Sequence, residues 1–462
     1  MEEAISQPIP SQEQKISFGE NLAYGCGDAA CNLVWSSIAA FMLFFYTDVA
    51  GIPAAIAGLI LLVARIIDGF VDLVVGALVD RTKTRFGKAR PWILWMVLPF
   101  GVLTVLLYSV PNFSVPGKIA YAAVVYTLIN IVYSCINIPY GTLNAMITQD
   151  QYQRSILNIF RMIMAMSAAV FVSAGTTGFV KALGGGAGAW QKIFGIYAVA
   201  AVILFMITFL FTRERVKSPD IHKPKSSVPL NMEVKALLKN SYLWVIVFTM
   251  IAMFISSGLG SATIYFARYI LGNVQLMAGM QLASYIPMLI GLFTIAPLIK
   301  KYGKRKCILA GAGLMAVGSL VIIANPASLP VVMTGLVIKS IGMAPWLATI
   351  YPMVLDTIEY GDWKTGVRSE GLIVSTTSVA SKFGTGIGAA LVGWILAAGS
   401  YVAGAAIQTH AAAEAIQICF MYLPAILAIT CVVLLSFYKL DAIYPQIAQE
   451  LHERDQSKLD AE

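Results

Sequence analysis

A short stretch of this chain places one arginine and two carboxylates within an apolar run. The run extends from about residue 54 to residue 79, and Arg65, Asp68 and Asp72 follow one another in it at spacings of three and four. In a helix these spacings put the three side chains on one face. Two carboxylates held together cannot both ionise cheaply, so they favour a proton, a small cation or an arginine. This is the chemistry of a cation-coupled transporter; the alternative is that Asp68 pairs with Arg65 to fix helix packing.

The apolar run around this stretch is long enough to cross a membrane. A helix of about 26 residues spans about 39 Å. An acidic side chain near the bilayer centre costs on the order of 2.5–3.5 kcal/mol on insertion scales. We therefore expect Asp68 and Asp72 to face a protein interior or a wet cavity.

The composition indicates an all-α polytopic membrane protein. Of the 462 residues, 58% are hydrophobic and 12% are charged, whereas soluble domains average about 25% charged residues. The apolar runs are long and continuous, which is typical of membrane-spanning helices and not of β-barrels. The net charge of +8 comes from basic residues gathered in loops. It is therefore not a sign of nucleic-acid binding, and we expect no nucleic-acid partner.

The histidines and cysteines do not form a recognisable site. The three histidines are far apart in the sequence, and the six cysteines include no CxxC pair. Cysteines in apolar runs fit packing positions better than a disulfide framework or a zinc site. Without a nucleophile–base or metal constellation, we expect no enzymatic activity, no bound metal and no cofactor apart from a coupling ion.

Twelve apolar runs are long enough to be transmembrane helices. Their approximate limits are 20–47, 53–79, 91–111, 118–147, 155–182, 190–212, 241–271, 275–299, 305–325, 329–355, 370–398 and 413–438.

A long polar linker divides the spans into six plus six. We expect a cytoplasmic N-terminal segment (1–19), a six-helix bundle (20–212), a cytoplasmic linker (213–240), a second six-helix bundle (241–438) and a cytoplasmic tail (439–462). Basic loops at equivalent places in the two halves form a weak internal repeat. Two such halves with a substrate site between them are the major facilitator arrangement.

Lysine and arginine concentrate in alternate loops. Residues 81–90, 213–239 and 300–306 are strongly basic, and loops of the other parity are nearly free of these residues. By the positive-inside rule, both termini are cytoplasmic. The exceptions are Lys118, Lys181 and Lys192.

Polar residues inside other spans point to a shared cavity, because such faces are costly in lipid. An aromatic ring can stack on a sugar ring while amides and charged groups bind its hydroxyls. For a single Asn or Ser, a hydrogen bond between helices is the alternative. The residues we expect to bind sugar are Asp28, Asn32, Trp35, Asn137, Arg161 and Lys382.

Almost end to end, the chain resembles the glycoside–pentoside–hexuronide:cation symporters of the major facilitator superfamily, which include the melibiose permease. The matching motifs are Phe45-Tyr46-Thr47-Asp48, Ala64-Arg65-Ile66-Ile67-Asp68, Arg85-Phe86-Gly87-Lys88-Ala89-Arg90-Pro91-Trp92, Asn137-Ile138-Pro139-Tyr140, Asp356-Thr357-Ile358-Glu359-Tyr360-Gly361-Asp362-Trp363 and Gly366-Val367-Arg368-Ser369-Glu370-Gly371.

The resemblance implies a cation site and a sugar site. By resemblance, Asp68, Asp72 and Ser134 bind the cation, and Arg161 and Lys382 match basic residues at the sugar and cation sites.

The chain also departs from the melibiose permease. A sodium-binding Asn there is here Val71, and two sugar-binding carboxylates there are here Asn32 and Asn137; Asp28 has no carboxylate counterpart there. Losing an amide oxygen weakens sodium coordination more than protonation, so we favour H⁺ over Na⁺. The pattern is most similar to the glucuronide and xyloside carriers.

The sequence therefore predicts a secondary active sugar symporter. It would couple uptake of a glycoside, pentoside or hexuronide to H⁺, or to Na⁺, by alternating access. The alternatives are a transporter of the same fold for a lipid, drug or sulfonated sugar, and a membrane enzyme or sensor. We expect a monomer, surrounded by lipid, in the cytoplasmic (inner) membrane of a bacterium. Contacts of a cytoplasmic gate are expected at Arg85, Lys88, Asp356, Arg368 and Glu370.

Overall fold

The computed structural model describes residues 16–216, 230–367 and 369–459. Within these ranges, twelve helices are long and apolar enough to cross a membrane, which confirms the predicted all-α polytopic fold. The first six spans are α1 (Phe18–Phe44) with its π-helical turn η1 (Phe45–Val49), α2 (Ala54–Arg81), α3 (Arg90–Leu107), α4 (Val115–Ile147), α5 (Gln151–Ala182) and α6 (Gly186–Phe211).

The second six spans follow a short helix, α7 (Leu230–Lys239). They are α8 (Ser241–Gly258) continued through η2 (Leu259–Ala262), α9 (Thr263–Tyr265) and η3 (Phe266–Ile270), then α10 (Leu276–Tyr302), α11 (Lys304–Ala324), α12 (Leu329–Thr365), α13 (Glu370–Ala398), and α14 (His410–Gln417) continued through η4 (Ile418–Tyr422) and α15 (Leu423–Ser436). The last helix is α16 (Leu440–Leu459).

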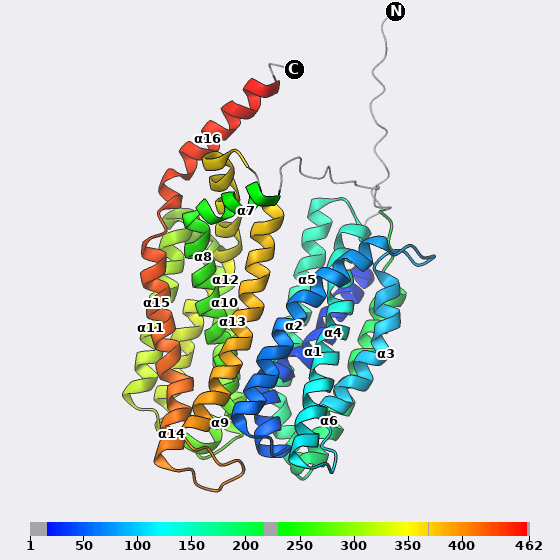
Figure 1. Cartoon of the computed structure of the whole chain (residues 1–462), viewed down its shortest axis with the longest axis vertical. Coiled ribbons are helices and arrows are strands. Elements are labelled where there is room, and N and C mark those ends of the chain that lie inside the picture. Colours follow the sequence, from blue (N-terminus) through cyan, green and yellow to red (C-terminus); the bar gives the residue numbers. More distant parts are fainter. Residues whose placement is uncertain (1–15, 217–229, 368, 460–462) are drawn as a thin grey trace, which may run out of the picture.

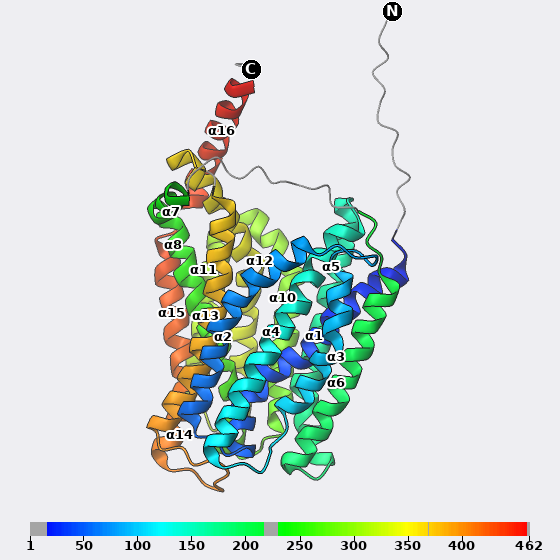
Figure 2. The ribbon, with the colours of Figure 1, turned by 45° about the vertical axis from the view of Figure 1, so that its right-hand side comes forward.

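The helices form two bundles that lie side by side (Figure 1). Helices α1 to α6 form the first half, and α7 to α16 form the second (Figures 1 and 2). Across the boundary α2 packs on α13, and α5 packs on α10. We call the end with α7 and α16 the terminal end, and the opposite end, with α14, the far end.

The far ends of the two halves repeat the same local structure. The first helix of each half ends in a π-helical turn, η1 or η3. The amide that follows each turn bonds to the carbonyl of its first residue, Phe45 at 2.8 Å or Phe266 at 3.1 Å. Each turn is then closed by a glycine with positive φ, Gly51 (73°) or Gly272 (72°), a conformation that glycine adopts without strain.

The basic loops at the terminal end also repeat. The carboxylate of Glu214 accepts hydrogen bonds from the amides of residues 88–90 at 2.8–2.9 Å, where α3 begins. In the second half, Asp441 accepts from the amide of Arg305, where α11 begins, at 2.8 Å. A carboxylate is stabilised at the positive end of a helix. A Cβ at Gly87 would lie 2.2 Å from the Glu214 carboxylate, so this loop requires glycine.

Three segments are more helical than was predicted from the sequence: the end of α12, the predicted tail, and the predicted linker, which contains α7. Helix α12 continues ten residues past the predicted end at residue 355 and stops at Gly366, which has a left-handed conformation (φ 68°). The predicted tail contains α16, which packs on this extension. Arg454 pairs with Asp362 at 2.8 Å. Hydrogen bonds from Trp363 and Gln446 lower the pKa of the Glu450 carboxyl.

Small residues let the two halves approach closely at the far end. A Cβ at Gly393 of α13 would lie 2.4 Å from the carbonyl oxygen of Ala54 on α2. A Cβ at Gly58 of α2 would lie 2.9 Å from the carbonyl oxygen of Ala390 on α13. Because backbone atoms cannot yield as a flexible side chain does, any larger residue must push the helices apart.

We predict that Gly393→Val lowers the thermal unfolding midpoint of the purified protein. Overpacking typically costs about 1–3 kcal/mol, and the clash here is with backbone. The matched control is Gly313→Val on α11, where an added Cβ meets nothing within 4 Å. Equal midpoints for the two variants would contradict the close crossing of α2 and α13.

Candidate functional site

The predicted cation ligands lie together in the interior of the protein. Asp68 of α2 is 2% exposed, and the side chain of Asp72, one turn later, is 28% exposed. The hydroxyl of Ser134 on α4 lies 2.7 Å from an oxygen of each carboxylate. The structure thus brings the three residues together; their role as cation ligands stays a prediction.

A lysine from the other half holds the acid pair. The ammonium of Lys382 on α13 lies 2.9 Å from Asp68 Oδ2 and 2.5 Å from Asp72 Oδ2. It also donates to the backbone carbonyl of Asp68 at 3.1 Å. The guanidinium of Arg65 lies farther away, 3.9 Å from Asp68 Oδ2. The net charge of these two acids and two bases is zero when all four are ionised. Lys382 lies closer to the carboxylates than Arg65 does, so it compensates their charge more strongly.

Ser134 Oγ, Asp68 Oδ1 and Asp72 Oδ1 lie at hydrogen-bond distances but share a single hydrogen. A serine hydroxyl carries a single hydrogen, yet Ser134 Oγ lies 2.7 Å from Asp68 Oδ1 and from Asp72 Oδ1. It can donate to only one of them. The second contact becomes favourable when a carboxyl hydrogen or a cation lies between the oxygens. The arrangement is therefore chemically suited to take up one proton or one small cation.

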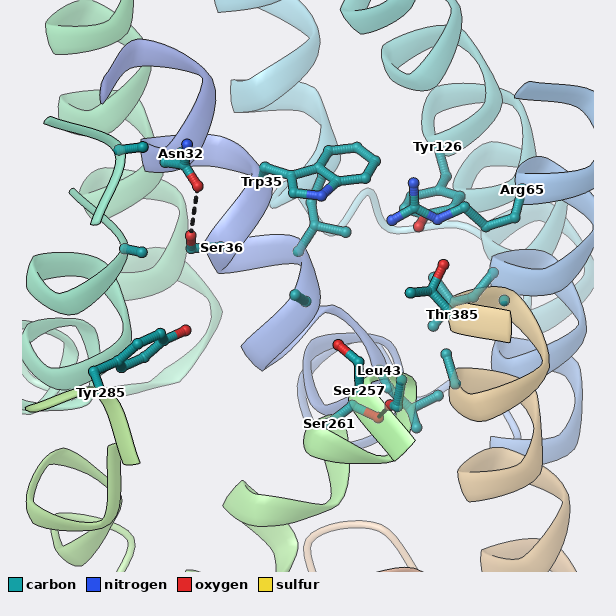
Figure 3. A pocket seen from close by; sticks show the side chains of 18 of the residues that line it. Asn32, Trp35, Ser36, Leu43, Arg65, Tyr126, Ser257, Ser261, Tyr285 and Thr385 are labelled. Carbon is teal, nitrogen blue, oxygen red and sulfur yellow. Dashed lines mark hydrogen bonds between the residues drawn. The ribbon is translucent and has the colours of Figure 1, made fainter. Parts of the chain in front are cut away.

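A larger cavity of about 360 Å³ lies between the two halves. Its polar lining comes from both of them. From the first half these residues are Asn32, Trp35, Ser36, Arg65 and Tyr126, and from the second half Ser257, Ser261, Tyr285 and Thr385. Figure 3 shows Tyr285 and Asn32 on one side and Arg65 and Tyr126 on the other. A mixture of aromatic rings, hydroxyls and an amide is suited to a polyhydroxylated ligand.

A second cavity of about 230 Å³ holds the acid pair. Asn137 and Lys382 line this cavity and not the larger one, whereas Asn32 lines only the larger one. Three residues, Trp35, Arg65 and Thr385, line both. Four of the six predicted sugar-binding residues are thus divided between two neighbouring compartments, with Trp35 in both, and the role of all six stays a prediction.

The indole of Trp35 is already in contact with protein groups. Its ring stacks on Tyr133 with 4.4 Å between centroids, and the guanidinium carbon of Arg65 lies 3.9 Å from the ring centroid. In a cation–π contact the charge lies over the ring face. A sugar that stacks on Trp35 must compete with these two neighbours.

Asp28 and Arg161 form an ion pair between α1 and α5. Arg161 Nε lies 2.9 Å from Asp28 Oδ2. Neither residue belongs to the described lining of the two cavities. Their geometry is that of a partly buried pair that joins two helices of the first half, and sugar binding by them stays a prediction.

Two of the five residues predicted for the gate bond to partners within their own halves. The amide of Lys88 bonds to Glu214, and Asp356 pairs with Lys304. Arg85 is exposed beside Phe86. Arg368 lies outside the described residues, and Glu370 is the first residue of α13. Their role in a gate stays a prediction.

A buried carboxylate at the far end joins the two halves, and the sequence analysis assigned it no role. The Asp48 side chain, in η1, is 1% exposed. Four of its five described donors belong to the second half. The donors are Thr47 Oγ1 (2.8 Å), Tyr401 Oη (2.7 Å), Tyr269 Oη (2.8 Å), Arg268 Nη1 (3.1 Å) and the amide of Gly404 (3.3 Å). One feature of the sequence could have pointed to this contact. Asp48 and Arg268 stand at corresponding places, near the ends of the first spans of the two halves.

Comparison with known proteins gives a family match over most of the chain. The family model described as MFS/sugar transport protein matches residues 23–442. The isoprimeverose transporter of Lactiplantibacillus pentosus is 35% identical over 450 residues, which cover 95% of this chain and 92% of that protein. The glucuronide carrier protein homolog of Escherichia coli K12 is 31% identical over 456 residues, covering 96% and 97%.

Solved structures share the fold at low sequence identity. The nucleoside transporter NupG aligns with a TM-score of 0.60 and 15% identity, covering 90% of this chain and 98% of that chain. A bacterial homologue of the human drug peptide transporters PepT1 and PepT2 aligns with a TM-score of 0.66 and 13% identity, covering 93% and 99%.

We predict that Asp48→Asn opens the far end. The amide keeps one accepting oxygen but loses the charge that Arg268 compensates, and truncating a buried, hydrogen-bonded charge pair typically costs about 2–5 kcal/mol. The measurement is labelling of Ser261→Cys by an impermeant thiol reagent added on the side of the far end. Ser261 is 4% exposed and the six native cysteines are buried, so background labelling is low.

The matched control is Asp80→Asn, which removes an exposed carboxylate at the terminal end of α2. It should leave labelling of Ser261→Cys unchanged. Labelling that Asp48→Asn does not increase would show that the Asp48 contacts do not keep the far end closed.

Proposed function

This chain belongs to the MFS/sugar transport protein family, and we propose that it is a symporter that carries a glycoside, pentoside or hexuronide with a cation held by Asp68, Asp72 and Ser134. The observation that carries this proposal is the cluster of three oxygens around Ser134, which lacks a hydrogen and lies beside a cavity with polar and aromatic groups from both halves. A cation has a suitable place next to the space where a sugar would bind.

The cluster favours a proton over sodium as the coupling ion. Sodium is usually held by several oxygens, whereas one hydrogen shared among three oxygens would complete the bonds around Ser134. An intramembrane lysine also competes for the same carboxylates, since Lys382 contacts both. A cation at the acid pair therefore weakens the attraction between the carboxylates and the ammonium, which is a contact between the halves.

The larger cavity is the proposed sugar site. Its volume of about 360 Å³ lies within the usual range of small-molecule sites. Relatives named for isoprimeverose and for a glucuronide support a cargo of this class. Because residues of both halves line the cavity, a bound sugar contacts both halves and can favour a conformation in which they are closer together.

Alternating access is the proposed mechanism. The halves contact each other at the far end through Asp48, and midway through Lys382. Rocking requires the Asp48 contacts to break on one side while the predicted gate residues meet on the other. We also propose that one chain suffices, since both cavities are lined by a single chain, and that the protein lies in the inner membrane of a bacterium with cytoplasmic termini.

We predict that Asp68→Asn abolishes sugar accumulation in whole cells while sugar exchange across the membrane persists. The amide keeps the shape of the side chain but does not take up a proton near neutral pH. The measurement is uptake of a radiolabelled glycoside found by a thermal-shift screen of glycosides, pentosides and uronides. Accumulation should collapse in the wild type when a protonophore is added, and it should persist without sodium.

The control is again the exposed Asp80→Asn, which should accumulate sugar as the wild type does. Accumulation that survives both the protonophore and sodium removal would overturn cation coupling. Full accumulation by Asp68→Asn would overturn the acid pair as the cation site.

A further inference from the structure

The wall between the two cavities is thin and contains one charged side chain. Trp35, Arg65 and Thr385 line both compartments. Of these three, only Arg65 carries a charge. It therefore lies within reach of the acid pair on one side and of the larger cavity on the other.

Arg65 makes a long ion pair with Asp68 and also contacts two aromatic side chains, Trp35 and Tyr126. Its guanidinium lies 3.9 Å from Asp68 Oδ2 and 3.9 Å from the centroid of Trp35. Its side chain is 12% exposed. A Cβ at Gly386 of α13 would lie 3.0 Å from Arg65 Cβ, so the base of the side chain is confined. The guanidinium at its end is the part that can change partner.

Charge balance makes this change of partner depend on the coupling cation. Asp68, Asp72, Lys382 and Arg65 sum to zero, so a cation at the acid pair creates a surplus of one positive charge. Lys382 contacts both carboxylates at 2.9 Å or less, whereas Arg65 reaches only one, at 3.9 Å. Coulomb attraction weakens with distance, so Arg65 is the base that is released at the lower cost.

We propose that Arg65 couples the two sites: it compensates Asp68 while the acid pair holds no cation, and turns to the sugar when a cation binds. This inference rests on the proposed function. A sugar that accepts hydrogen bonds from Arg65 draws it away from Asp68 and so favours cation binding, and linkage requires the same effect in reverse. Lys382 is less suited to this role because it lines only the smaller cavity.

The groups that can influence Arg65 come from three helices. The titratable and charged groups around it are Asp68 and Asp72 on its own helix, Tyr126 and Tyr133 on α4, and Lys382 on α13. Trp35 can report the position of Arg65, because it is uncharged and the guanidinium lies over its indole ring. A shift of Arg65 changes the environment of that ring.

The experiment measures the tryptophan fluorescence of the full-length protein in detergent without any sugar. The added cations are sodium, exchanged against choline at constant ionic strength, and protons, added by lowering the pH. The part of the signal that disappears in Trp35→Phe belongs to Trp35. We expect a cation-dependent change in this part for the wild type, and the loss of most of that change in Arg65→Gln.

Two further variants keep the test decisive. Arg65→Met fills a similar volume without charge and replaces Arg65→Gln if that protein does not fold. Arg65→Lys restores the charge without the flat guanidinium and should recover part of the response, which a purely structural role would not predict. The matched control is Lys306→Gln, which removes an exposed positive charge at the terminal end of α11 and should respond as the wild type does.

A thermal-shift measurement with the same cations separates the two proposals. A cation that raises the unfolding midpoint of the wild type but leaves the Trp35 signal unchanged overturns the role of Arg65 and leaves cation binding intact. A response of full amplitude in Arg65→Gln also overturns it. If the cations change neither the midpoint nor the fluorescence, cation coupling itself fails.

Discussion

The constraint on which the rest of the structure depends is the pair of carboxylates buried in a transmembrane helix. An ion removed from water requires compensation nearby, or its cost is several kcal/mol. Here the compensation is drawn from both halves: Arg65 lies on the same helix, whereas Lys382 reaches across from α13. The negative charge of the first half is therefore compensated in part by a lysine of the second half. Any event that changes the charge of the pair also changes what holds the halves together.

The architecture around this pair is a repeated unit adapted for movement. Both halves end their first helix in a π-helical turn followed by a glycine with positive φ. Asp48 in one turn meets Arg268 and Tyr269 in the other. Near them, Gly58 and Gly393 let α2 and α13 touch through backbone atoms. The contacts at the far end are thus polar or close-packed through small residues, and such contacts can separate and form again without exposing a large apolar core.

The sequence was sufficient to predict the features that depend on local residue patterns. Hydropathy predicted the twelve spans, and helical spacing predicted that Asp68 and Asp72 share one face that avoids lipid. The three-dimensional arrangement of the site could not be predicted, because it depends on how the two halves pack against each other. Spacing alone could not show that Asn32 and Asn137 would line different cavities, because that division depends on where Trp35 and Arg65 lie between them. Asp48 was also missed, since its four partners in the second half are more than 200 residues away.

The two compartments also bear on how the proposed symport is coupled. If the sugar and the cation occupied a single pocket, direct contact between them would be enough for coupling. Here Trp35, Arg65 and Thr385 separate the proposed sugar site from the proposed cation site, so coupling requires a protein group that responds to both. Communication by a charged side chain needs only a small movement, because an ion pair changes energy steeply with distance when its surroundings exclude water. A sugar without its cation would then meet an arginine still held by Asp68, and that competition disfavours transport of either partner alone.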